Sequence, residues 1–155
     1  MKSTPETYRE AAMEHIASAS DLWHAGSYVL ANYVSGLAVE CMLRAYATRL
    51  HPQQWDKSDH SLVSWYKEAR FDLIVPDSKR QIIGTSIGEV RTNWENRQRY
   101  SSSSLLRAEF KHKKLDRGIS GDFVKEITKN TLDAASEIAF LGDAQWKNSQ
   151  KKLEL

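Results

Sequence analysis

Apolar side chains recur every three or four residues along most of this 155-residue chain, and this spacing constrains the fold more than any other feature. Such spacing places the apolar residues on one face of each helix. No segment alternates apolar and polar residues for more than a few positions, so the pattern typical of strands does not occur. The sequence therefore predicts an all-α protein, an antiparallel bundle of about five amphipathic helices.

Capping residues, glycine and proline mark the ends of the first two helices. Thr4 followed by Pro5 is typical of a helix start, because Thr accepts a hydrogen bond from a free backbone N–H and Pro suits the first helical position. We expect this helix to end at Gly26. A second helix is expected over about residues 27–50, where Pro52 stops it.

The middle of the chain predicts two further helices. Residues 53–59 have the composition of a loop, and a short third helix is expected over about 61–70. Residues 71–75 are apolar but have no second strand to pair with, so we expect a packed loop. A fourth helix, capped by Asp77, is expected to reach about Tyr100.

The last third of the chain predicts one more helix. The serine run 101–104 interrupts the apolar pattern, and 105–118 is compatible with either a mobile loop or a short basic helix. A fifth helix is expected over 122–142, between an aspartate cap and a glycine stop. The whole pattern indicates a single domain over residues 4–142, followed by a polar tail over residues 143–155.

Several classes of site and location are not expected from this sequence. The most apolar stretch, 25–50, carries Glu40, Arg44 and Arg49, which argues against a membrane span. The start of the chain has no apolar leader, so we expect a cytoplasmic location. Cys41 is the only cysteine, and no two histidines stand four residues apart, so neither a disulfide nor a metal site is expected. We likewise expect no cofactor.

Small residues in the second helix predict close helix packing. Gly36 costs roughly 1 kcal/mol of helix propensity relative to alanine, and a packing role accounts for its presence. The stripe formed by Ala31, Ser35 and Ala38 favours approach of another helix, including one from a second copy of the chain.

Glu40 stands four residues before Arg44, which predicts an ion pair within the helix. The alternative is that Glu40 reaches across the bundle to orient an arginine such as Arg91. The sequence favours the first alternative, which gives Glu40 a structural role.

Three segments resemble a known family. Residues 25–45 read AGSYVLANYVSGLAVECMLRA and resemble the second helix of HEPN domains (higher eukaryotes and prokaryotes nucleotide-binding), which reads roughly A-x-Y-L-x-G-x-A-x-E-x-x-L-K-A. The sequence His60-Ser61-Leu62 is similar to the His-x-Leu that opens the next helix in that family. Residues 91–100 read RTNWENRQRY and resemble its fourth-helix segment, which often ends in Arg-Tyr. The likeness spans about residues 8–141.

The resemblance implies a helical bundle that usually dimerises. Many HEPN relatives are metal-independent ribonucleases whose motif is an arginine, four to six residues of any kind, and a histidine. Other relatives lack the motif and bind nucleotides or a nucleotidyltransferase-type partner. In this chain Gln98 stands where the motif histidine belongs, with six residues between it and Arg91. Gln cannot transfer a proton near pH 7, and such transfer contributes about 10²- to 10⁴-fold in rate, so we expect weak catalysis or none.

Arg107 and His112 form a second candidate catalytic pair, because four residues separate them. They lie after the serine run, outside the helix that carries the motif in the family. The alternative for this pair is a solvated basic loop.

Positive charge is concentrated between residues 91 and 117, where eight Lys and Arg stand against three acids. Such a concentration favours an anionic partner, although a solvated helix face with ion pairs is the alternative. We expect nucleotide or nucleic-acid binding by Arg91, Arg97, Gln98, Arg99, Tyr100, Lys111, Lys113 and Lys114.

These observations favour one function and leave two others open. The first is a homodimeric HEPN-like module that binds RNA or a nucleotide without efficient catalysis. The second is a metal-independent endoribonuclease of a toxin–antitoxin or defence system, with Arg91, Arg107 and His112 as its catalytic residues. The third is an interaction module for a nucleotidyltransferase-type antitoxin.

Overall fold

The computed structural model describes residues 2–52 and 59–153, and every regular element within these ranges is helical. The predicted all-α class is therefore confirmed, with seven α-helices and two 3-10 helices where about five helices were expected. The elements are α1 (Pro5–His24), α2 (Tyr28–Leu50), α3 (Leu62–Glu68), α4 (Phe71–Ile74), η1 (Asp77–Lys79), α5 (Arg80–Asn93), η2 (Asn96–Tyr100), α6 (Ser103–His112) and α7 (Phe123–Leu153).

Helix α1 begins as its sequence predicts. The Thr4 hydroxyl accepts a hydrogen bond from the Thr7 backbone N–H, and the Thr7 hydroxyl accepts one from the Thr4 N–H in return. These reciprocal bonds satisfy donors that the helix itself leaves free. After α1 ends at His24, Gly26 adopts a φ of +83°, a left-handed conformation that lets the chain reverse directly into α2.

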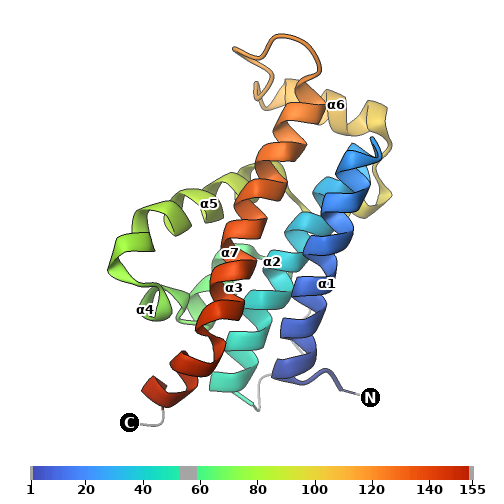
Figure 1. Ribbon diagram of the computed structural model, residues 1–155. Coiled ribbons are helices and arrows are strands. Elements are labelled where there is room, and N and C mark those ends of the chain that lie inside the picture. The colour runs from blue at the N-terminus through green and yellow to red at the C-terminus, as the bar shows by residue number, and fades with distance from the viewer. Residues whose placement is uncertain (1, 53–58, 154–155) are drawn as a thin grey trace.

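Helices α1, α2 and α7 lie side by side and form the body of the molecule (Figure 1). Helix α1 runs antiparallel to α7, because Arg9 pairs with Asp143 at one end while Trp23 donates to the Lys125 carbonyl at the other. Helix α2 runs parallel to α7, since the Tyr46 hydroxyl donates to the Gly142 carbonyl near the carboxyl end of both helices. The predicted antiparallel arrangement is wrong for this pair. Parallel neighbours need a crossover, which α3 to α6 supply.

Helix α7 continues to Leu153, so its predicted end at Gly142 is wrong. A Cβ at Gly142 would lie 2.7 Å from the Met42 sulfur, so this glycine allows close packing inside the helix and does not stop it. Past this point the buried Trp146 ring stacks edge-on against Tyr46, and Arg49 donates to the Trp146 carbonyl. Burial of this indole therefore keeps the segment that was expected to be a polar tail helical as far as Leu153.

The crossover differs from the sequence prediction at two places. Residues 71–74 form one helical turn (α4) in place of a loop, because Phe71 packs edge-on against Tyr46 in the core. Helix α5 ends at Asn93, well before the expected Tyr100, because Trp94 takes an extended conformation. Most of the loop predicted for 53–59 lies outside the described residues.

The segment after the serine run forms the basic helix that was one of its two alternatives. Helix α6 starts at Ser103, and the Ser102 hydroxyl caps it by accepting from the Leu105 N–H. The inner face of α6 packs Leu106 and Phe110 against Phe123 at the start of α7, in a small core separate from the main one. Among the residues that the structure covers, none of the helices combines the length and apolar character that a membrane crossing requires.

Candidate nucleic-acid interface

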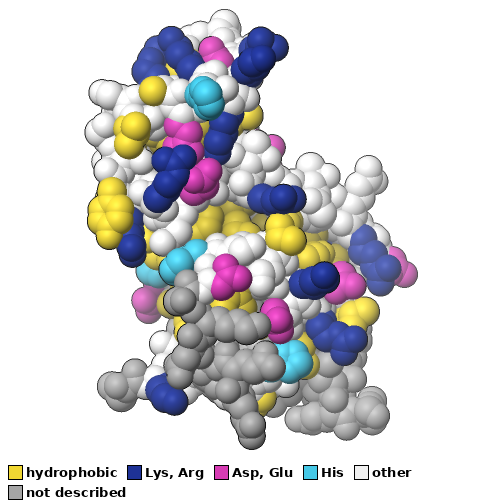
Figure 2. Space-filling view, turned by 180° about the vertical axis from the view of Figure 1, so that it is seen from behind, with side chains coloured by type: hydrophobic (Ala, Val, Ile, Leu, Met, Phe, Trp, Pro, Cys, Tyr) yellow, Lys and Arg dark blue, Asp and Glu magenta, His cyan; other side chains and the backbone are white. Residues whose placement is uncertain are grey.

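Four exposed cations project from α6 and the turn that follows it. We call this surface the basic end; it comprises Arg107, Lys111, Lys114 and Arg117. None of the four has a carboxylate within ion-pair distance in the described ranges. Figure 2 shows Lys and Arg side chains gathered at this end of the molecule, opposite the end where both termini lie in Figure 1. Unneutralised cations at one end create a local positive potential that the small net charge of the chain, +2, does not reveal.

The start of α7 supports two of these cations. The Arg107 guanidinium lies over the Phe123 ring, 4.5 Å from its centroid, and the Lys111 ammonium lies 5.8 Å from the same centroid. Arg107 and Lys111 are one helical turn apart on α6, so both project over the same ring. The Phe123 ring thereby holds two positive charges together at the surface.

Tyr100 and Arg99, which precede α6 in the chain, offer a stacking surface. Tyr100, at the end of η2, is 78% exposed, and the Arg99 guanidinium lies 4.7 Å from its ring centroid. An exposed aromatic ring next to a guanidinium is the combination on which nucleic-acid bases stack. Both side chains are exposed, but the 3-10 helix η2 carries them in place of the long fourth helix that the sequence predicted.

Two of the predicted ligand-binding cations are neutralised within the chain. Arg97 pairs with Glu95 and Glu109, and Lys113 pairs with the same two carboxylates. The hydrogen bond from Arg97 holds the pKa of Glu95 below its usual value. These four residues tie η2 to α6. The alternative of an ion-paired surface is therefore correct for Arg97 and Lys113, and the ligand-binding role predicted for them is not supported.

Gln98 does not face the surface. Its side chain is 1% exposed, its oxygen accepts from the Asn32 amide at 3.0 Å, and its nitrogen donates to the Asn93 carbonyl at 3.1 Å. Asn32 donates to the same Asn93 carbonyl. Gln98 thus joins η2 to α2 and to the end of α5 inside the protein. The predicted contact between Gln98 and a nucleic acid or nucleotide is wrong, because no ligand reaches this amide in the folded chain.

We expect Gln98→Leu to lower the free energy of unfolding by about 2 kcal/mol, because it leaves the buried Asn32 amide and Asn93 carbonyl short of partners. Urea unfolding followed by circular dichroism measures this loss. The matched control is Gln81→Leu at an exposed position of α5, with an expected change within about 0.5 kcal/mol. Equal midpoints for the two variants would show that the Gln98 network contributes nothing.

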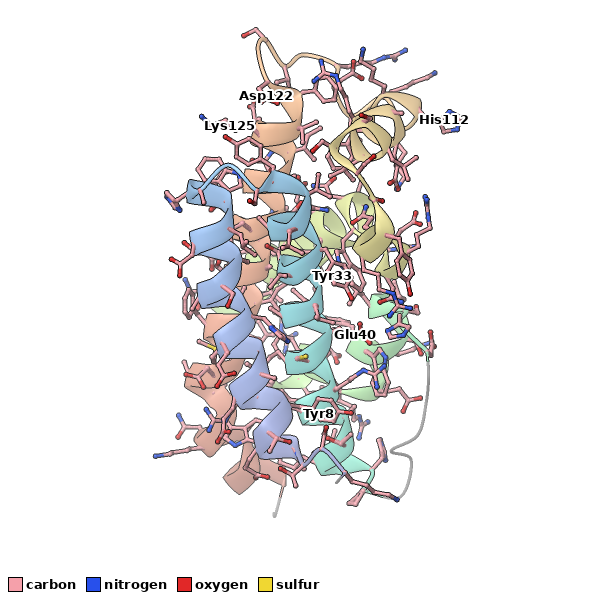
Figure 3. All side chains as sticks on the ribbon, turned by 90° about the vertical axis from the view of Figure 1, so that its right-hand side faces the viewer. Tyr8, Tyr33, Glu40, His112, Asp122 and Lys125 are labelled. Carbon is pink, nitrogen blue, oxygen red and sulfur yellow. The ribbon has the colours of Figure 1, made fainter. Side chains whose placement is uncertain are left out.

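The structure separates the second catalytic pair. Five positions along α6 turn Arg107 and His112 about 140° apart around the helix axis. Arg107 extends over α7, whereas His112 projects outward from the far end of α6 (Figure 3). His112 has no hydrogen-bond partner among the described residues. The two side chains of one protomer therefore do not form a shared site.

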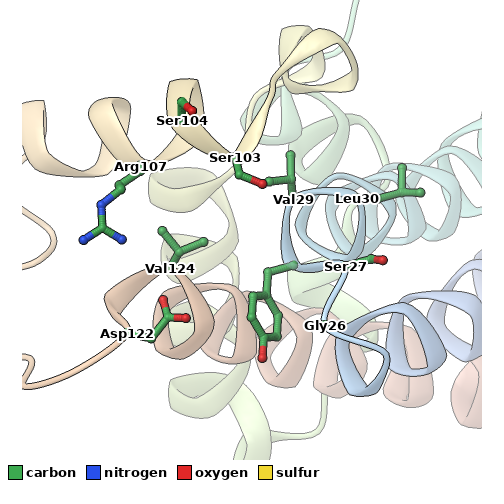
Figure 4. A pocket seen from close by; sticks show the side chains of 10 residues that line it. Gly26, Ser27, Val29, Leu30, Ser103, Ser104, Arg107, Asp122 and Val124 are labelled. Carbon is green, nitrogen blue, oxygen red and sulfur yellow. The ribbon is translucent and has the colours of Figure 1, made fainter.

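A cavity of about 600 Å³ lies beside the basic end, where α2, α6 and α7 all begin (Figure 4). Arg107 lines it, together with Ser103 and Ser104 from the first turn of α6. The volume lies within the range of small-molecule sites. The amino-terminal ends of helices favour anions, but Asp122 also lines the cavity, and its carboxylate already accepts from the Lys125 N–H. The cavity therefore adjoins the basic end without itself defining a ligand.

Glu40 holds two partners, and Arg91 is not one of them. Its carboxylate is 2% exposed and accepts from Arg44 at 2.7 Å and from the His60 ring at 2.8 Å. The predicted ion pair with Arg44 is confirmed. Arg91 lies on the exposed side of α5 and lines a small cavity together with His60. In the sequence, His60 stood out only as the first residue of the segment that resembles the start of the next HEPN helix, and its contact with Glu40 was not expected.

The small-residue stripe of α2 is buried within the protomer. Ala31, Ser35 and Ala38 are all fully buried, in a helix whose neighbours are α1 and α7. This stripe therefore cannot serve as the dimer surface that it suggested. Gly36, on the same helix, lies directly under the Trp94 indole.

No protein-family model, curated protein or solved structure matches this chain. The chemistry of the site must therefore be inferred from its own residues. The described residues contain no group of three or more His, Cys, Asp or Glu placed to hold a metal ion. Burial raises the pKa of the Cys41 thiol to about 12, so Cys41 is protonated at neutral pH and is not a nucleophile.

Proposed function

We propose that this protein is a HEPN-like module that binds RNA through the basic end and does not cleave it efficiently. The observation that carries the proposal is the set of four exposed cations on α6 and the turn after it, which have no carboxylate partner among the described residues. Phosphate contacts by such side chains supply most of the sequence-independent affinity for nucleic acid. The resemblance of α2 to the second helix of HEPN domains supports the same family of functions.

Tyr100 and Arg99 together favour RNA over a simple polyanion as the ligand. The exposed Tyr100 ring and the Arg99 guanidinium offer a stacking surface for an unpaired base, and the cations of the basic end offer contacts for the backbone. Recognition of single-stranded RNA commonly combines these two contacts. We therefore expect single-stranded RNA to bind more tightly than heparin of equal charge.

The buried position of Gln98 and the outward direction of His112 support a binding role over a catalytic one. We expect total RNA to remain intact when it is incubated with the protein in EDTA. The resemblance also favours a homodimer, although the α2 stripe is excluded as its interface. Light scattering at working concentration measures the oligomeric state.

RNA affinity measured by fluorescence anisotropy tests the proposal. We expect Arg107→Ala/Lys111→Ala to weaken binding of a single-stranded RNA about tenfold near 0.1 M salt, or 1.4 kcal/mol. The slope of log affinity against log salt is expected to become shallower by about 1.4, because two phosphate contacts are lost. Replacement of Tyr100 by alanine is expected to weaken binding with little change in that slope.

The matched control is Lys79→Ala/Arg80→Ala, which removes the same amount of charge at the start of α5, outside the basic end. Arg80 pairs there with Asp77. This variant is expected to bind RNA within about twofold of the original protein, because only long-range electrostatics change. If both double variants weaken RNA binding equally, the interaction follows net charge, and the basic end is not an RNA site.

A further inference from the structure

A second, smaller cavity lies between the start of α3 and the end of α5. Its volume is about 230 Å³. His60 and Leu62 line one wall, and Arg91 and Trp94 line the other. The volume is below the range of about 300–1,000 Å³ for sites that enclose a small molecule, so the cavity is sized for one chemical group of a larger ligand.

The His60 ring is held in one orientation. Its Nδ1 lies 2.8 Å from the Glu40 carboxylate, which cannot donate when ionised, so Nδ1 carries the proton of that hydrogen bond. Arg44 braces Glu40 with a hydrogen bond of 2.9 Å. The backbone before His60 is fixed as well, because the Asp59 carbonyl accepts from both Arg44 and Trp65. This arrangement leaves Nε2 without a partner among the described residues.

Arg91 lines the same cavity, and its guanidinium group is unpaired among the described residues. Its side chain is exposed and has no ion pair or hydrogen bond in the described ranges. The one acid that lines the cavity, Glu95, is already paired with Arg97 and Lys113. A guanidinium in this situation can hold an oxyanion with two parallel hydrogen bonds.

We propose that this cavity binds a phosphate monoester, which Arg91 and the protonated His60 hold from opposite walls. A monoester dianion matches two cations, and His60 Nε2 donates to a phosphate oxygen once it carries a proton. The proposal does not depend on RNA binding by the basic end. The second Glu40 oxygen, Oε2, is buried without a hydrogen-bond partner among the described residues.

Proton uptake at His60 makes anion affinity depend on pH. The charged groups around the ring are Glu40 and Arg44 from α2, Asp59 before α3, and Arg91 with Glu95 across the cavity. Because binding needs a proton on Nε2, affinity is expected to fall when rising pH removes that proton. Sulfate, which stays a dianion between about pH 5 and 8, reports this proton separately from the titration of phosphate itself.

Side-chain NMR of ¹⁵N-histidine-labelled protein tests the proposal with inorganic phosphate as the probe. We expect saturable shifts of the His60 resonances, with His15, His24 and His51 unchanged as internal controls. The exposed Arg91→Ala change is expected to weaken the phosphate affinity at least about tenfold. Arg80→Ala, on the same helix, is the matched control and should leave it unchanged. No shift at His60, or equal affinity in Arg91→Ala, would overturn the proposal and leave the His60–Glu40 bond as a structural tie.

Further ligands identify the source of the monoester. Tighter binding of 5′-phosphorylated than of 5′-hydroxyl RNA, lost in Arg91→Ala, would assign the end of an RNA strand. Saturable binding of adenosine 5′-monophosphate without that preference would assign a mononucleotide. The Arg107→Ala/Lys111→Ala variant should retain the phosphate shifts of His60, so failure of the basic end as an RNA site is distinguishable from failure of this cavity.

Discussion

Replacing Gly36 by alanine is expected to lower the free energy of unfolding by about 2 kcal/mol. A Cβ at this position would lie 2.2 Å from the Cγ and Cδ1 atoms of the Trp94 indole. The indole cannot retreat, because it is 4% exposed and its Nε1 donates to the Tyr33 carbonyl. Overpacking of this kind costs about 1–3 kcal/mol or more, which outweighs the gain of roughly 1 kcal/mol in helix propensity. Urea unfolding measures the balance.

Gly88→Ala is the matched control for this prediction. Gly88 also lies inside a helix, α5, but a Cβ there would meet no atom within 4 Å. Only the propensity effect remains, so this variant is expected to be more stable by roughly 1 kcal/mol. Stability changes of opposite sign in Gly36→Ala and Gly88→Ala would show that close packing against Trp94 is the reason why position 36 requires glycine. A stabilising Gly36→Ala would show that α2 and the segment after α5 separate without cost.

Replacing Glu40 by alanine is the second change with a large expected effect, a loss of about 3 kcal/mol. The carboxylate is buried, and it neutralises Arg44, whose side chain is only 12% exposed. Removing one partner of a buried ion pair leaves the other charge uncompensated, which costs about 3–5 kcal/mol. His60 also loses the bond that orients its ring. Chemical unfolding measures the loss, and broadened histidine resonances are expected to report the freed ring.

The control for Glu40 is Asp133→Ala, which removes an exposed i, i+4 pair with Lys129 on α7. Exposed pairs contribute about 0–1 kcal/mol, so the expected change is within about 0.5 kcal/mol. The loss of stability in Glu40→Gln is expected to lie between those of Glu40→Ala and Asp133→Ala, because the amide oxygen can still accept one hydrogen bond. If Glu40→Ala were as mild as the control, the other contacts of Arg44, such as its hydrogen bond to the Asp59 carbonyl, would be sufficient to hold its charge in the folded protein.

The helical class and most helix starts were predictable from the sequence, because they depend on nearby residues. Thr4 caps α1 through Thr7, three residues away, and Asp122 caps α7 through Lys125 in the same way. Local spacing also located the basic segment around α6. Such signals need no knowledge of the rest of the chain.

Helix ends were less predictable, because distant contacts decide them. Helix α5 ends at Asn93 because Trp94 turns its indole into the space over Gly36, 58 positions earlier in the chain. Helix α7 continues past Gly142 because Trp146 is buried against Tyr46, on another helix. Local propensity favoured the opposite result at both places, and tertiary packing outweighed it.

The properties of the candidate sites can also be separated into those set by nearby residues and those set by distant contacts. The sequence by itself determined that this chain forms amphipathic helices and carries an excess of positive charge near α6, since both properties belong to residues close together in the chain. Only the tertiary structure decided which charges stay unpaired, that Gln98 is buried, and that His60 shares a cavity with Arg91. The physical reason is distance along the chain: pairing, burial and cavity formation arise when elements far apart in sequence pack together, and no local pattern encodes them.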